Sequence, residues 1–167
     1  RRVRALCEDG NGYIWVGTSD GILIFKPEEL IRNPDAYYHY NLDNKSLQSN
    51  EIRSITQDSK QNIWIAETGA GFCVCNPTNE YDKISFTHYG VEDGLVNGMV
   101  QAFVEDDKGL IWISTEYGIS CFNPEQKTFE NLFFFGDMLS NVYSENCAAK
   151  LPDGRLVFGS NKGLTII

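Results

Sequence analysis

The sequence lacks the residue patterns that usually mark a metal centre or a catalytic site. Histidine occurs only twice in 167 residues, and the five cysteines include no Cys-x-x-Cys pair. Zinc sites and thiol redox centres use such pairs or denser clusters of ligands. We therefore expect no metal site, no cofactor and no catalytic residue in this segment, and we predict that the segment is not an enzyme.

Long apolar runs and clustered positive charge are also missing. The chain carries 14 lysines and arginines against 23 aspartates and glutamates, which gives a net charge of −9, and its basic residues are scattered. A nucleic-acid groove needs clustered basic side chains, so we expect no nucleic-acid partner for this segment. No apolar run approaches the roughly 18 residues that indicate a membrane-spanning helix. We expect a membrane to be reached only through parts of a longer protein.

Four similar stretches repeat along the chain. Each centres on a short apolar run that contains a tryptophan, or a valine in the last copy, and the centres are 49, 48 and 45 residues apart. The repeated anchors are Trp15, Trp64, Trp112 and Val157, then Gly21, Gly71, Gly118 and Gly163, then Pro27, Pro77 and Pro124. A period of this size indicates a supersecondary unit that buries its faces by stacking on its neighbours.

Within each repeat, the pattern predicts short strands joined by tight turns. Apolar runs of four to six residues alternate with glycine, asparagine and aspartate, and no stretch has a sustained helical period. The first copy predicts strands over residues 3–7, 13–17 and 22–25. A less regular fourth strand is expected at residues 37–40, 84–89 and 128–135 of the first three copies. Proline should end each third strand, because it cannot donate to a sheet ladder.

The length and strand content of the repeats predict an all-β fold. Four antiparallel strands per repeat, with residues 63–66 and 72–75 apolar on both faces, are typical of a β-propeller blade. We predict a single partial β-propeller over residues 1–167, with about four blades of four-stranded antiparallel sheets. The blades are placed at about 1–46, 47–94, 95–137 and 138–167, and the last is incomplete.

A partial propeller should have partners that cover its open ends. We expect the chain to be an excerpt of a longer protein, completed by the remaining propeller blades. Alternatively, a second copy of the chain could complete a ring of roughly eight blades. A strictly monomeric mass of the isolated chain in solution would contradict this self-association.

Residues with reactive side chains recur at fixed repeat positions, which favours structural roles. His39 and His88 each follow a repeat tryptophan by 24 residues and precede a tyrosine. Aspartates beside the glycine-rich turns are expected to accept backbone hydrogen bonds. Each second strand is expected to end in a residue whose hydroxyl bonds to backbone groups of the next turn. These residues are Thr18, Thr68, Thr115 and Ser160. The cysteines are interpreted as small buried hydrophobic residues.

Recognition is more plausible in the segments that do not repeat, because loops on a rigid scaffold carry function. The longest such segment covers residues 28–50 and is rich in aromatic residues. Tyr37, Tyr38 and His39 are the candidate ligand-binding residues, and the alternative for the tyrosines is core packing.

At the level of motifs, the repeats resemble the two-component regulator propeller repeat. The second copy carries Leu47, Asn50, Ile52, Asp58, Ile63, Trp64, Ile65, Thr68 and Gly71. The third copy is closer still, through residues 93–95, 105–115, 118–119 and 122–124, and residues 138–141, 153–160 and 163–164 resemble the last blades. The resemblance covers essentially the whole chain. Gln61, Gly98 and Val157 depart from the repeat.

The resemblance implies a function that the residues alone do not reveal. Such repeats build periplasmic sensors of hybrid two-component histidine kinases in gut Bacteroidetes, many of which bind oligosaccharides and control polysaccharide use. The resemblance therefore implies an oligosaccharide ligand, a periplasmic location and a kinase outside this chain. Two alternatives stay open: a metal-dependent propeller lyase of the streptogramin-inactivating type, and a non-catalytic propeller that binds proteins.

Overall fold

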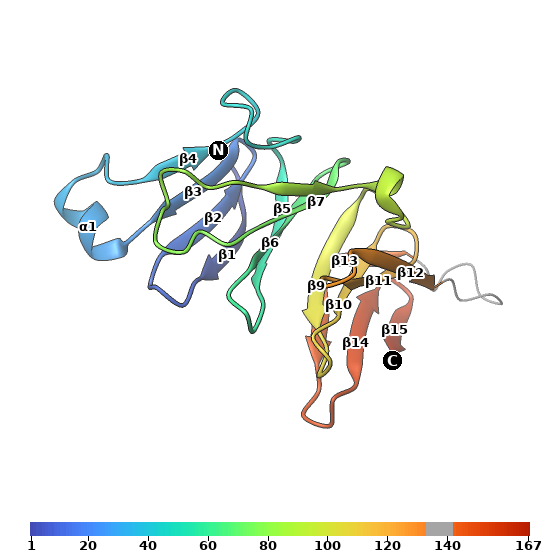
Figure 1. Ribbon diagram of the computed structural model, residues 1–167. Helices are drawn as coiled ribbons and strands as arrows, with labels where there is room; N and C mark the ends of the chain where they lie inside the picture. Colours follow the sequence, from blue (N-terminus) through green and yellow to red (C-terminus); the bar gives the residue numbers. More distant parts are fainter. Residues whose placement is uncertain (133–141) are drawn as a thin grey trace. The chain divides into compact units, whose positions relative to one another are not determined.

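The computed structural model describes residues 1–132 and 142–167, and its regular structure is almost entirely β. Four antiparallel sheets follow one another along the chain, three with four strands and the last with three (Figure 1). The prediction of an all-β propeller segment with an incomplete last blade is confirmed. The chain divides into two compact units: Arg1–Thr68 with Phe72–His88, and Gly69–Gly71 with Tyr89–Ile167.

The first unit is built on two sheets. The first sheet has the order β1 (Val3–Glu8), β2 (Ile14–Thr18), β3 (Gly21–Phe25) and β4 (Tyr38–Tyr40). A single short helix, α1 (Pro27–Arg32), lies between β3 and β4. The second sheet has the order β5 (Ile52–Gln57), β6 (Ile63–Glu67), β7 (Gly71–Cys75) and β8 (Thr87–Tyr89). The first residue of β7 and the last residue of β8 are counted with the second unit.

The second unit repeats this plan after a single turn of 3-10 helix, η1 (Val91–Asp93). Its first sheet contains β9 (Val100–Glu105), β10 (Ile111–Thr115), β11 (Ile119–Asn123) and β12 (Thr128–Leu132). Its second contains β13 (Tyr143–Lys150), β14 (Leu156–Ser160) and β15 (Gly163–Ile166). The last part of the fourth strand predicted at 128–135, and the start of the blade predicted at 138, lie outside the described residues.

The core of the first unit lies where its two sheets pack against each other. Trp15 and Ile24 from the first sheet and Ile52 and Ile65 from the second are all fully buried in one cluster. Every residue of β6 is buried, as its apolar residues on both faces predicted. Apolar burial of this extent is the main contribution that stabilises stacked blades.

Two of the repeated glycines show why the repeat requires glycine. Gly21 has φ +84°, and a Cβ atom there would lie 2.1 Å from the carbonyl oxygen of Tyr40. Gly71 has φ +78°, and its Cβ would lie 2.2 Å from the carbonyl oxygen of Tyr89. Only glycine accepts both the left-handed backbone and the close approach of the neighbouring strand.

The prolines also behave as the pattern predicted. Pro27 follows β3 and opens α1, where its missing N–H is not needed. Pro77 and Pro124 follow the ends of β7 and β11.

Over residues 1–132 and 142–167, the helices are too short and too polar to cross a membrane.

Candidate functional site

The turn between the first two strands of a blade is organised by one aspartate. In the first blade, Asp9 Oδ1 accepts the backbone N–H groups of Asn11 (2.9 Å) and Tyr13 (3.0 Å). Asp9 Oδ2 accepts the indole N–H of Trp15 at 2.9 Å. The same bonds form around the next two aspartates, Asp58 with Trp64 and Asp106 with Trp112. The repeated aspartates thus have the structural role predicted from the sequence.

The bond from the tryptophan to the aspartate was not predicted, although the repeat contains a signal for it. Each pair is separated by six residues. In the last blade, Leu151 takes the aspartate's place in the turn, since Leu151 N donates to Arg155 O and Leu151 O accepts from Gly154 N. The residue six positions later is Val157. Both members change together, because a buried carboxylate without the indole donor would lose a partner.

The hydroxyl at the end of the second strand closes the following turn, as predicted, in three blades. The hydroxyls of Thr18, Thr115 and Ser160 donate to the carbonyl oxygens of Gly21, Gly118 and Gly163. The assignment of Thr68 to this position was wrong. The last residue of β6 is Glu67, and the Thr68 hydroxyl is buried without a hydrogen-bond partner. The second blade has one extra residue in this turn, which shifted the alignment by one position.

Glu67 lies in a cluster of polar side chains that the sequence pattern did not predict. Its carboxylate is fully buried, and Oε1 lies 2.8 Å from Nδ1 of His88. Cys73, fully buried on β7, completes the group. Burial, followed by the charge of Glu67, raises the pKa of the Cys73 thiol well above its ordinary value, so the thiol is protonated and bonds to Glu67.

A polar pocket of about 320 Å³ opens in the first unit beside the turns of its two sheets. Five side-chain amides line it, from Asn11, Gln57, Gln61, Asn76 and Asn79. Lys60 is the single basic residue of its lining. Each amide offers both a donor and an acceptor, so the pocket suits a neutral ligand with many hydroxyls better than a strongly charged one.

The loop after β7 supplies the pocket's aromatic wall. Tyr81 stacks on Tyr13 with ring centroids 3.7 Å apart, and its hydroxyl donates to Asp9 Oδ2 at 2.6 Å. Asn11 Nδ2 donates to the same hydroxyl at 3.1 Å. Burial, together with the bond to Asp9, raises the pKa of the Tyr81 phenol, so it acts as a neutral donor.

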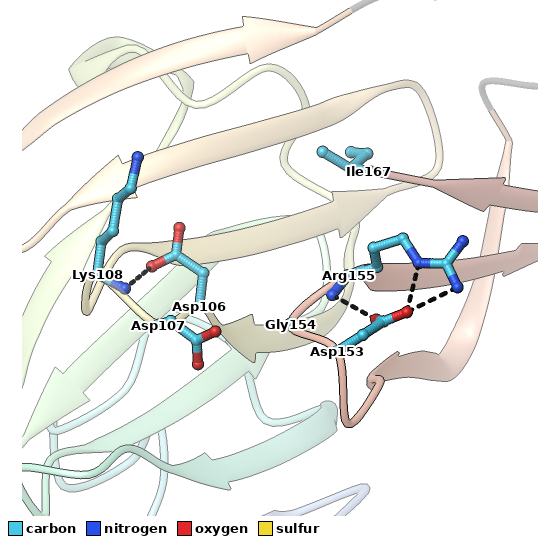
Figure 2. Close-up of a pocket in the computed structure, with 7 residues that line it drawn as sticks. All are labelled: Asp106, Asp107, Lys108, Asp153, Gly154, Arg155 and Ile167. Carbon is cyan, nitrogen blue, oxygen red and sulfur yellow. Dashed lines mark hydrogen bonds and ion pairs between the residues drawn. The ribbon is translucent and has the colours of Figure 1, made fainter.

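A second pocket, of about 280 Å³, lies in the second unit (Figure 2). Most of its charged side chains already have partners: Asp106 Oδ1 accepts the backbone N–H of Lys108, and Arg155 binds Asp153 through Nε and Nη2, both at 2.8 Å. The hydrogen bonds from Arg155 lower the pKa of Asp153. Asp107 pairs with Lys150. These charged side chains mainly hold the turns, which makes this pocket the weaker candidate.

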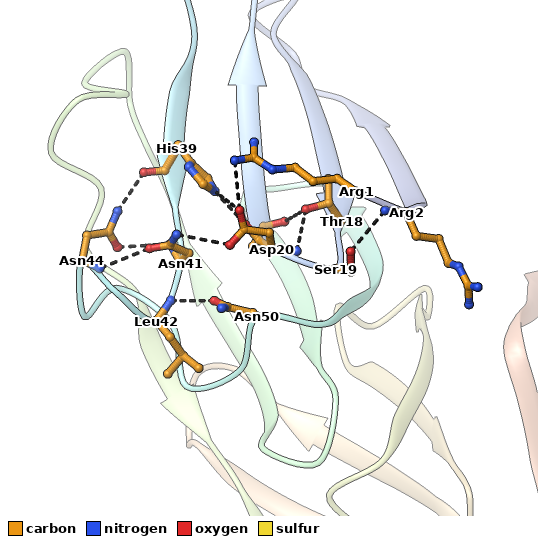
Figure 3. A network of polar contacts seen from close by, with 11 residues as sticks. Arg1, Arg2, Thr18, Ser19, Asp20, His39, Asn41, Leu42, Asn44 and Asn50 are labelled. Carbon is orange, nitrogen blue, oxygen red and sulfur yellow. Dashed lines mark hydrogen bonds and ion pairs between the residues drawn. The ribbon is translucent and has the colours of Figure 1, made fainter.

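The structure separates the three candidate residues of the 28–50 segment. Tyr38 is 36% exposed, and its ring lies 6.3 Å from that of Tyr81, so it borders the aromatic wall of the first pocket. Tyr37 is exposed. The ring of His39 points elsewhere, and its Nε2 bonds to the backbone oxygen of Asp20 at 2.6 Å (Figure 3). That network also includes Arg1 and Asn41, which both bond to the Asp20 carboxylate.

The five cysteines differ in burial, whereas the sequence interpretation treated all of them as buried. Cys73, Cys75 and Cys121 are buried, as expected, and burial raises the pKa of Cys121 to about 11. Cys7 is half-buried, whereas Cys147 is exposed, so it does not act as a buried hydrophobic residue. All five are free thiols.

Comparisons with known proteins agree with this geometry. Residues 1–20, 46–69 and 94–117 match the two component regulator propeller family. Histidine kinase P4 from Formosa agariphila is 24% identical over 163 residues, which cover 98% of this chain and 12% of that protein. The extracellular domain of a hybrid two component system from Bacteroides thetaiotaomicron is 28% identical with a TM-score of 0.82, over 98% of this chain and 21% of that one.

A second extracellular domain of this kind from the same organism is 20% identical, with a TM-score of 0.52, and its match covers 99% of this chain and 29% of that domain. This likeness supports the fold alone. The chain therefore spans between about an eighth and a third of the length of these relatives.

The repeated sheets and their shared turn define the class of the molecule as a β-propeller segment. Three stretches of the chain match the two component regulator propeller family, and the chain is similar to a histidine kinase and to the extracellular domain of a hybrid two component system. The family resemblance predicted from the motifs is confirmed.

Proposed function

We propose that this chain is a ligand-sensing segment of the periplasmic part of a hybrid two-component histidine kinase. The observation that carries the proposal is the match of 98% of the chain, at 28% identity, to the extracellular domain of a hybrid two component system. In this proposal the segment itself is not an enzyme. Kinase activity and the crossing of the membrane belong to parts outside the chain, and the remaining blades or a second copy cover its open faces.

The ligand proposed for this sensor is an oligosaccharide, bound in the amide-lined pocket of the first unit. Sugar hydroxyls both donate and accept hydrogen bonds, and side-chain amides match them in both respects. The exposed ring of Tyr38 beside Tyr81 offers an apolar face of the kind that packs on the C–H groups of a sugar ring. A pocket of about 320 Å³ has room for one or two sugar units of a longer chain.

Signalling would follow from a ligand that binds one arrangement of the blades more tightly than another. A ligand that contacts turns of two blades favours the arrangement in which those turns match its hydroxyls. Coupling to the dimer of the parent protein would pass this preference across the membrane to the kinase and to genes for polysaccharide use.

Isothermal titration of the parent ectodomain against a panel of oligosaccharides tests this proposal. We expect at least one glycan to bind, and Asn76→Ala to weaken that binding by about tenfold, because one buried hydrogen bond contributes about 1.4 kcal/mol. Asn76 is exposed and lines the pocket, so its loss should leave the fold intact.

Lys108→Ala is the matched control, because Lys108 is an exposed residue that lines the pocket of the second unit. The Lys108→Ala ectodomain should bind the glycan with the affinity of the wild type. Glycan binding that is weakened by Lys108→Ala and not by Asn76→Ala would move the site to the second unit. Binding of a protein partner with no glycan binding at all would overturn the oligosaccharide proposal.

A further inference from the structure

Three metal-ligating side chains converge on the second sheet of the first unit. Glu67 ends β6, Cys73 lies in β7 and His88 lies in β8, so each of three strands contributes one ligand. The sulfur of Cys73, a ring nitrogen of His88 and a carboxylate oxygen of Glu67 all lie within 4.8 Å of one another. Glu67 and Cys73 are fully buried, and the side chain of His88 is 22% exposed.

The repeat provides an internal comparison. The equivalent residues are Thr18, Leu23 and His39 in the first blade and Thr115, Ser120 and Asn131 in the third. The first blade retains the histidine, but Thr18 and Leu23 stand at the positions of the carboxylate and the thiol. Among the described sheets, only the second blade places three metal-ligating side chains at these positions. A blade does not need the three together for folding, since the first blade has only the histidine and the third has none of them.

The outer atoms of the cluster are held by backbone groups. Glu67 Oε2 accepts the backbone N–H of Gln48 at 2.6 Å and that of Ser49 at 3.3 Å. His88 Nε2 donates to the backbone oxygen of Ser46 at 3.2 Å. Ligand side chains in metal sites are oriented in the same way, by hydrogen bonds from the atom that faces away from the metal.

The inner atoms of the cluster face one another. With Nε2–H donating to Ser46, His88 Nδ1 is the ring atom that faces Glu67 Oε1, at 2.8 Å. The sulfur of Cys73 lies within 4.8 Å of a ring nitrogen of His88 and of a carboxylate oxygen of Glu67. Three donor atoms that converge at such distances are an arrangement that a divalent cation binds, and the cation displaces protons from such ligands.

We propose that Glu67, Cys73 and His88 form a binding site for a borderline divalent transition-metal ion, of which Zn²⁺ is the preferred example. A thiolate, an imidazole and a carboxylate are the donors that Zn²⁺ takes, whereas Ca²⁺ and Mg²⁺ require oxygen ligands. Binding releases the proton of the Cys73 thiol, because the thiolate is the ligand, and a water completes the fourth position. The partly exposed edge of His88 provides the entry path. This inference does not depend on the proposed sensing function.

Metal titration of the reduced chain tests the proposal directly. We expect Zn²⁺ to bind with a stoichiometry of one and to raise the melting temperature, because the ion binds the folded state alone. Co²⁺ should bind at the same site and show the thiolate-to-metal charge-transfer absorption of a cysteine ligand. Cys73→Ser should abolish this absorption and weaken Zn²⁺ binding by at least about tenfold.

Matched variants separate the site from adventitious binding. His88→Asn keeps a hydrogen-bonding side chain like Asn131 of the third blade, and it should lose the metal while keeping the fold. His39→Asn and Cys147→Ser should leave the affinity unchanged. Circular dichroism of each variant checks that it is folded. The proposal is overturned if the chain binds no stoichiometric Zn²⁺, or if Cys147→Ser removes the binding while folded Cys73→Ser and His88→Asn retain it.

Discussion

Replacing Trp15 by alanine is expected to lower the free energy of unfolding of the first unit by about 3–5 kcal/mol. Trp15 is fully buried between the two sheets of this unit, and its indole N–H bonds to Asp9. The substitution leaves a large cavity and removes that hydrogen bond. Urea denaturation followed by circular dichroism measures the change.

Trp15→Phe is the control that separates packing from hydrogen bonding. Phenylalanine fills much of the same space, and Asp9 keeps its bonds to Asn11, Tyr13 and Tyr81. We expect this variant to lose about 1–2 kcal/mol. If alanine and phenylalanine had equal effects, the indole hydrogen bond and not the packing would be the main contribution of Trp15.

Glu67→Leu is expected to lower the free energy of unfolding by about 3 kcal/mol in the presence of a metal chelator. The change leaves the backbone N–H groups of Gln48 and Ser49 and the imidazole of His88 without their acceptor. Donors that face a fully buried position lose more than donors in open solvent when their acceptor is removed. The estimate is at the low end for a broken buried pair, because His88 is partly exposed.

Glu67→Gln is the matched control, since it retains an oxygen that can accept from the loop at 48–49. A loss of about 1–2 kcal/mol is expected for it. Chemical denaturation with EDTA present measures both variants without a contribution from bound metal. A Glu67→Leu protein as stable as the wild type would show that the carboxylate does not hold the loop to β6.

The repeat pattern predicted the strands because each strand is specified locally. The alternation of apolar runs with glycine, asparagine and aspartate predicted the first three strands of the first blade to within one residue of their observed ends. The fourth strands were predicted unevenly: β4 begins one residue after the predicted start at 37, whereas β8 has only the last three residues of the predicted range 84–89. Their pairing depends on long connections whose course is not periodic.

The polar clusters were harder to predict because their members come from distant parts of the chain. Tyr81 reaches Asp9 across 72 positions, and no local pattern indicates that contact. The end of the second strand was assigned to Thr68 and not to Glu67, because one extra turn residue shifted the alignment. An alignment that kept the end of the second strand three residues after the tryptophan would have placed a carboxylate among hydroxyls, and this signal was present in the sequence.

The sequence by itself determined that the chain forms repeated four-stranded units, where glycine and proline end their strands, and which family these units resemble. These features follow from periodic burial and from backbone conformations that only particular residues accept. The tertiary structure decided which side chains meet. It forms the amide-lined pocket and the cluster of Glu67, Cys73 and His88, and it directs the Tyr38 ring toward Tyr81 and the His39 ring toward Asp20. Such sites depend on distances of a few ångströms between segments, which the stacking and pairing of strands determine and a local pattern does not.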